Sequence, residues 1–94
     1  MNLFDRVNKE ILLYYFMKQS FASLVFQYLE KSGIELDSAT KRPIERVGRE
    51  VDSRSGEMTW EKGLDRCHSS AKLYRLSASA MRSLKSDLQR NYYR

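Results

Sequence analysis

The chain has 94 residues and a formal net charge of +5 at pH 7, a length that predicts one domain with a core only just sufficient for independent folding. One proline and four glycines are too few for an all-β protein, which needs a turn about every 8–12 residues. The single cysteine excludes an internal disulfide.

Residues 3–31 are predicted to form a long helix that ends at Gly33, since glycine favours the left-handed conformation that closes helices. Within it, seven apolar residues and one lysine recur at alternating intervals of three and four residues, a spacing that keeps one helix face toward a partner helix. These residues are Phe4, Val7, Ile11, Tyr14, Lys18, Phe21, Val25 and Tyr28. Lys18 lies inside the apolar stretch 11–29. A lysine near a bilayer centre costs about 2.5–3.5 kcal/mol, so we expect a buried protein helix and no membrane span.

Residues 33–56 are predicted to hold a connector and a short second helix, with Pro43 in its first turn. Its apolar side chains are Ile44, Val47 and Val51. Acids and bases alternate around them at salt-bridge spacing, which is typical of a solvated helix face. This helix therefore covers only part of the apolar surface that the two longer helices present.

Residues 59–92 are predicted to form the third helix, with Thr59 as its N-cap. Its heptad seam contains Trp60, Leu64, Cys67, Ala71, Tyr74, Ala78, Met81, Lys85, Leu88 and Tyr92. A second apolar stripe, about 130° from this seam by helical periodicity, contains Leu73, Leu76, Ala80 and Leu84.

The fold class expected from these helices is all-α, with two long antiparallel helices and a short helix between them in a single domain over residues 1–94. A hairpin buries one stripe per helix, so the second stripe predicts association with another chain. A homodimer is the simplest way to complete the bundle, and an obligate hetero-partner is the other.

Catalytic and ligand motifs are absent from the sequence. Cys67 and His68 are adjacent, so on a helix they point about 100° apart and do not converge on one atom. The chain has no other histidine or cysteine and no glycine-rich phosphate loop. We therefore expect no enzyme activity, metal, cofactor or small-molecule substrate. We expect a cytoplasmic protein, because nothing resembles a signal peptide or a disulfide framework.

The positive charge is concentrated in residues 59–94, where three acids accompany eight bases, namely Lys62, Arg66, Lys72, Arg75, Arg82, Lys85, Arg90 and Arg94. The leading hypothesis is a small protein–protein interaction module, an adaptor, inhibitor or regulatory subunit, that docks a helix into a partner's groove. Its expected partner-binding residues are Leu73, Leu76, Leu84, Lys72, Arg75 and Arg82. The alternative is a dimeric nucleic-acid-binding accessory protein that contacts phosphates through Arg75, Arg82, Arg90 and Arg94.

Overall fold

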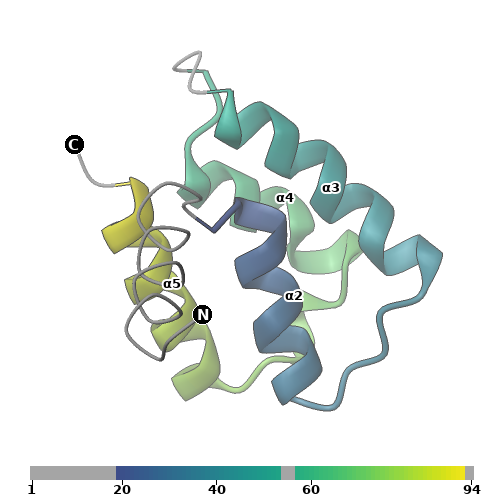
Figure 1. Ribbon diagram of the computed structural model, residues 1–94. Helices are drawn as coiled ribbons and strands as arrows, with labels where there is room; N and C mark the ends of the chain where they lie inside the picture. The colour runs from purple at the N-terminus through teal and green to yellow at the C-terminus, as the bar shows by residue number, and fades with distance from the viewer. Residues whose placement is uncertain (1–18, 54–56, 93–94) are drawn as a thin grey trace, which may run out of the picture.

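Four α-helices and one short 3₁₀ turn make up residues 19–53 and 57–92, the part of the chain that a computed structural model describes (Figure 1). The elements are α2 (Phe21–Lys31), α3 (Ser38–Asp52), α4 (Trp60–Ser70), η1 (Leu73–Arg75) and α5 (Ala78–Tyr92). No strand occurs within these two ranges, which confirms the all-α class. Residues 3–18 of the first expected helix lie outside them. Within them, the prediction of one continuous helix from residue 3 to residue 31 is wrong at Gln19 and Ser20, because these residues are not helical and the Ser20 side chain caps the start of α2.

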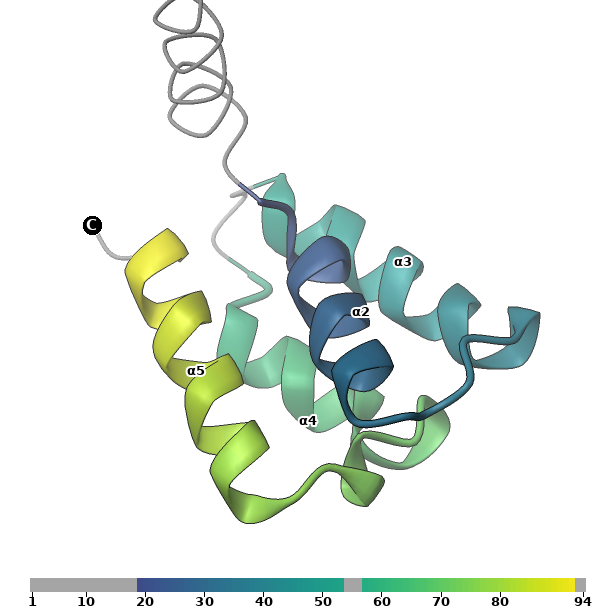
Figure 2. The ribbon, with the colours of Figure 1, turned by 60° about the horizontal axis from the view of Figure 1, so that its bottom comes forward.

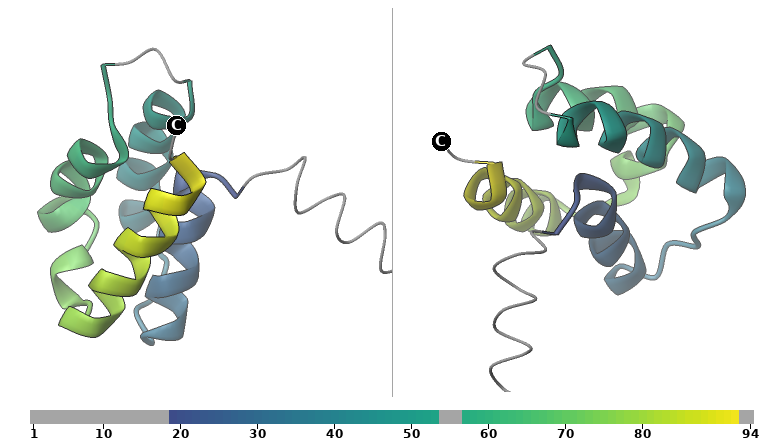
Figure 3. Two further views of the ribbon diagram at one scale, coloured as in Figure 1. Left: turned by 90° about the vertical axis from the view of Figure 1, so that its left-hand side faces the viewer. Right: turned by 45° about the horizontal axis from the view of Figure 1, so that its top comes forward.

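The helices pack in two layers around a shared core. One layer contains α2 and α5, and the other contains α3 and α4 (Figures 2 and 3). The main contacts join α2 to α3, α3 to α4, α4 to α5 and α5 back to α2, so each helix packs against at least two others. The core therefore forms between two pairs of helices and replaces the expected hairpin of two long helices.

Each helix start is marked in the sequence by a side-chain oxygen that accepts a hydrogen bond from the amide three residues on. These N-caps are Ser20, Asp37, Thr59 and Ser77. The expected caps at Thr59 and the glycine end at Gly33, whose φ is 74°, are confirmed. The second helix differs from expectation because Asp37 starts it at Ser38, which places Pro43 inside the helix.

The predicted continuous helix over residues 59–92 is wrong. Helix α4 ends at Ser70, and Lys72 adopts a left-handed conformation with φ of 64°. The 3₁₀ turn η1 follows, and α5 begins only at Ala78. Seven residues, 71–77, therefore separate the two α-helices, and α5 lies in the other layer, beside α2 (Figure 3).

Burial of the second apolar stripe explains this break. Leu73, Leu76 and Leu84 are buried, whereas the seam residues Tyr74 and Lys85 are exposed. Burying a leucine side chain contributes about 1.5–3 kcal/mol, while one non-glycine residue in the left-handed region costs about 1–2 kcal/mol. Three buried leucines therefore outweigh the strain at Lys72.

Gly63 allows α4 to lie close against α2 and α3. A Cβ at this position would be 2.9 Å from Val47 Cγ1 and 3.1 Å from both Phe21 Cζ and Val51 Cγ2. All three neighbours are buried, and Phe21 is completely inaccessible. A glycine in mid-helix normally costs about 1 kcal/mol relative to alanine, so at this site close packing of helices offsets the loss of propensity.

Candidate interaction surface

The apolar residues expected to bind a partner belong to the core. Leu73 and Leu84 have no exposed surface, and Leu76 retains 9%. The prediction that they form an exposed stripe is wrong, because the break after Ser70 turns this stripe inward. The folded chain cannot insert these leucines into a partner's groove without opening its own core.

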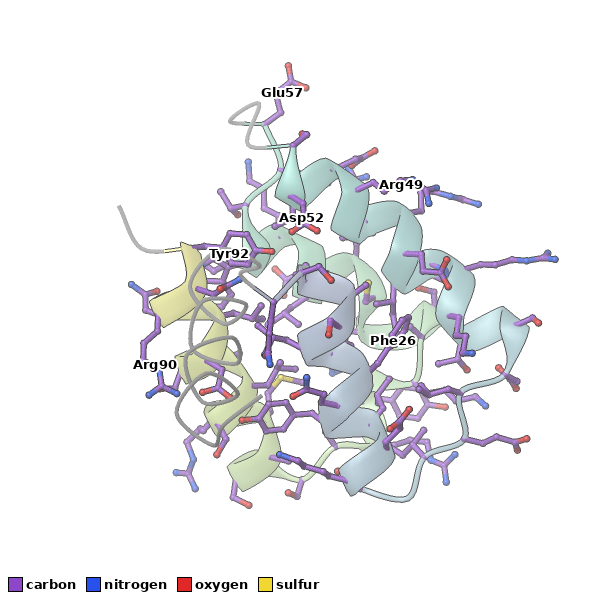
Figure 4. All side chains as sticks on the ribbon, viewed as in Figure 1. Phe26, Arg49, Asp52, Glu57, Arg90 and Tyr92 are labelled. Atoms are coloured by element: carbon purple, nitrogen blue, oxygen red, sulfur yellow. The ribbon has the colours of Figure 1, made fainter. Side chains whose placement is uncertain are left out.

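Basic side chains cover the solvent face of α5. Arg82, Lys85 and Arg90 are exposed, and Figure 4 shows Arg90 on the side of α5 that faces away from α2. The other exposed side chains of this helix are small or uncharged, namely Ala78, Ser79, Ser83, Ser86 and Gln89. We call this surface, Arg82, Lys85 and Arg90 with the exposed serines and Gln89, the basic face of α5.

Asp87, the one acid of α5, lies at the edge of this face and bonds toward α2. Its carboxylate accepts a hydrogen bond from the Tyr28 hydroxyl and forms an ion pair with Arg90. The Tyr28 hydrogen bond, followed by the contact with Arg90, holds the pKa of Asp87 below its ordinary value. The same hydrogen bond raises the pKa of the Tyr28 phenol. Asp87 thus links α5 to α2 through a hydrogen bond to a charged carboxylate.

The remaining expected basic residues occupy the turn between α4 and α5. Lys72 pairs with the N-cap carboxylate Asp37 at 3.4 Å, which ties the turn to the start of α3. Arg75 is exposed at the end of η1. The expected single basic stripe is therefore divided between this turn and the basic face of α5. Arg94, the last residue of the alternative set, lies outside the described residues.

Tyr74 is the exposed residue that the sequence pattern missed. The heptad seam placed it inside, yet 59% of its surface is accessible, and no other large hydrophobic residue in ranges 19–53 and 57–92 is exposed to that degree. Its ring lies 6.3 Å from that of His68, at an interplanar angle of 58°. Only the left-handed turn at Lys72, which heptad spacing does not predict, brings Tyr74 to the surface.

Asp52 joins the ends of three helices. As the last residue of α3, it accepts hydrogen bonds from the Phe21 amide at 3.3 Å and from the Tyr92 hydroxyl (Figure 4). The Asn91 side chain, next to Tyr92, donates to the Gln19 carbonyl. The sequence indicated only a solvated charge at Asp52, since its partners are 31 and 40 residues away.

Cys67 and His68 diverge in the structure. Cys67 is completely buried, and burial raises the pKa of its thiol to about 11. His68 is exposed. Within the described ranges, no three His, Cys, Asp or Glu side chains are grouped to hold a metal ion. In the same ranges, no helix is both long enough and apolar enough to cross a membrane.

Comparisons with models of protein families, with curated proteins and with solved structures find no match to this chain.

Proposed function

We propose that this chain is a small non-enzymatic interaction protein that binds an acidic surface of a partner protein through the basic face of α5. The observation that carries the proposal is the exposure of Arg82, Lys85 and Arg90 on a helix face that presents no unpaired acid among its described residues. Charge complementarity steers encounter and selects partners, which suits an adaptor, inhibitor or regulatory subunit.

The burial of Leu73, Leu76 and Leu84 changes the expected mode of binding. Docking of an apolar helix stripe into a groove is replaced by contact between the cations of α5 and carboxylates of the partner. Because exposed charges are screened over about 8 Å at physiological ionic strength, we expect the association rate to fall as salt is added.

The test is affinity capture of the tagged chain from its native host, with and without nuclease. The variant Arg82→Glu/Lys85→Glu reverses the basic face and should lose the co-eluting protein. A matched control, Arg46→Glu/Arg49→Glu, makes the same charge change on exposed positions of α3 and should retain it. Equal loss in both variants would assign the effect to net charge and would overturn the proposed surface.

A nucleic acid is the second candidate partner. Ser79, Ser83 and Ser86 are exposed between the basic side chains of α5 and add neutral donors suited to phosphate oxygens. If three cations each neutralise one phosphate of duplex DNA, log K should fall with log salt at a slope of about −2.7. Loss of the captured partner on nuclease digestion would favour this candidate over an acidic protein.

We also propose that the chain forms a homodimer. The heptad positions Phe4, Val7, Ile11 and Tyr14 support it, and they lie outside the described residues. Light scattering at micromolar concentration should give twice the chain mass of 11.1 kDa. A stable monomer would remove self-association from the proposal and leave the basic face of α5 as the binding surface.

A further inference from the structure

The turn between α4 and α5 presents an aromatic and a basic side chain side by side. Tyr74 is 59% accessible, and the next residue, Arg75, is also exposed. By contrast, other large side chains near the surface, such as Phe26, Trp60 and Tyr92, pack partly against the core. Among the described residues, this degree of exposure of a large hydrophobic side chain is therefore particular to this turn.

The turn is held in one conformation. Leu73 and Leu76, on either side of Tyr74 and Arg75, are buried and fix the backbone to the core. Two backbone hydrogen bonds close the turn, from Arg75 N to Lys72 O and from Leu76 N to Leu73 O, each 3.0 Å. A rigid backbone removes the cost of ordering the loop on binding, so only the side-chain rotamers of Tyr74 and Arg75 have to be fixed.

The charged residues next to Tyr74 in the sequence are all basic. Residues 66–86 include Arg66, Lys72, Arg75, Arg82 and Lys85 and no acid. Asp37, an acid from the start of α3, contacts this turn and is paired with Lys72. Arg75 makes no ion pair with any residue in the described ranges, so its guanidinium is available to a carboxylate on another molecule.

We infer that Tyr74 and Arg75 are the anchor of an interface with a partner protein, whose complementary site is an apolar recess bordered by carboxylates. The inference rests on the proposed function and specifies where on the surface binding energy is concentrated. Tyrosine and arginine are the residue types most enriched at energetic centres of interfaces, together with tryptophan. The basic face of α5 then supplies electrostatic steering around this anchor.

A protein partner fits this turn better than a single-stranded nucleic acid does. Sequence-tolerant strand binding uses several aromatic side chains on which successive bases stack. Within ranges 19–53 and 57–92, Tyr74 is the one large hydrophobic side chain that is exposed, and His68 stands against its ring at a tilt of 58°. One anchor is enough to fill a protein recess, whereas one ring gives no stacking platform.

The experiment places the photoreactive residue p-benzoylphenylalanine at one position at a time of the full chain in its native host. The positions are Tyr74 at the turn, Ser86 on the basic face of α5, and Glu45, an exposed position on α3, as the control. After irradiation, adducts are treated with nuclease or protease, and the crosslinked peptide is sequenced. We expect a discrete, nuclease-resistant adduct from position 74 that contains an acidic peptide, with none from position 45.

The identified partner is then titrated with purified variants. Tyr74→Ala should weaken binding at least about 30-fold, the factor that corresponds to the 2 kcal/mol of an energetic centre, while Tyr74→Phe keeps most of the affinity. Arg75→Glu should weaken binding further than Arg46→Glu does. Circular dichroism should be unchanged, because Tyr74 and Arg75 contribute little to the core.

Four results overturn the inference. A nuclease-sensitive adduct at position 74 would identify a nucleic acid. Adducts that form equally at positions 74 and 45 would indicate nonspecific collision. A protein adduct at position 86 without one at position 74 would keep the proposed function and remove the anchor, whereas loss of protein adducts at both would remove both.

Discussion

Replacement of Leu84 by alanine tests whether the chain breaks between α4 and α5. Leu84 has no exposed surface and lies among the buried residues of the core. A leucine-to-alanine change at such a site costs about 2–5 kcal/mol, which combines lost transfer energy with the cavity that remains. We expect a loss of about 3 kcal/mol, a large part of the roughly 5–15 kcal/mol that stabilises a typical domain.

The expected loss can be measured by urea unfolding followed through the far-ultraviolet circular dichroism signal at 222 nm. In a heat scan, about 3 kcal/mol corresponds to a fall in Tm of about 12–24 °C for a domain of this size. The neighbouring variant Lys85→Ala is the control. Lys85 is exposed, so its replacement should change the free energy of unfolding by less than about 0.5 kcal/mol.

An uninterrupted helix over residues 59–92 makes the opposite prediction. Its heptad seam would contain Lys85, and Leu84 would lie on an outer stripe. Leu84→Ala would then be nearly neutral in the isolated chain. A loss below about 1 kcal/mol for Leu84→Ala, or a larger loss for Lys85→Ala, would refute the break and the burial of the leucine stripe.

Three further predictions concern packing and titration. Gly63→Ala should lower the free energy of unfolding by about 1–2 kcal/mol, because overpacking outweighs the gain in helix propensity. Gly48→Ala, whose Cβ would meet its nearest neighbour at 3.3 Å, should lower it less in the same denaturation assay, and the reverse order would contradict the close approach at Gly63. Asp87 has a lowered pKa, so its contribution is present above 3.8 and disappears as pH falls through the folded-state value. Tyr28→Phe should therefore reduce the fall in Tm that occurs as the pH is lowered. If Tm falls with acid as steeply in this variant as in the original chain, the hydrogen bond contributes nothing to stability. Cys67, with a pKa of about 11, should react with a thiol reagent at pH 8 only when denaturant unfolds the chain, and rapid labelling of the native protein would show that it is accessible.

The candidate surface was predictable in its charge and not in its geometry. The concentration of bases after residue 65 follows from composition, and Arg75 and Arg82 are exposed as a binding role requires. The assignment of Leu73 to the same surface failed because it assumed one helical phase from residue 59 to residue 92. The break over residues 71–77 brings Leu73, Leu76 and Leu84 into the core and leaves Tyr74 and Lys85 exposed, while other residues of the seam stay buried, namely Leu64, Cys67, Ala71 and Leu88.

Local signals in the sequence predicted the helical class and two helix ends, the start of α4 after Thr59 and the end of α2 at Gly33. Ser20, Asp37, Thr59 and Ser77 satisfy amides that lie three residues ahead, so these contacts are independent of the rest of the fold. The same holds for Gly33, which closes α2 through its own backbone conformation. Of the four caps, the sequence patterns predict only Thr59, because they indicate long continuous helices through Ser20 and Ser77 and a later helix start at Pro43.

Only the tertiary structure decided how the last third of the chain is divided. Two competing apolar patterns occur there, a heptad seam through Tyr74 and Lys85 and a stripe through Leu73 and Leu84. The choice depends on what α2 and α3 offer for packing, and α2 offers both apolar contacts and the Tyr28 hydroxyl for Asp87. Because burial free energy is set by neighbours distant in sequence, periodicity alone does not select between the two patterns.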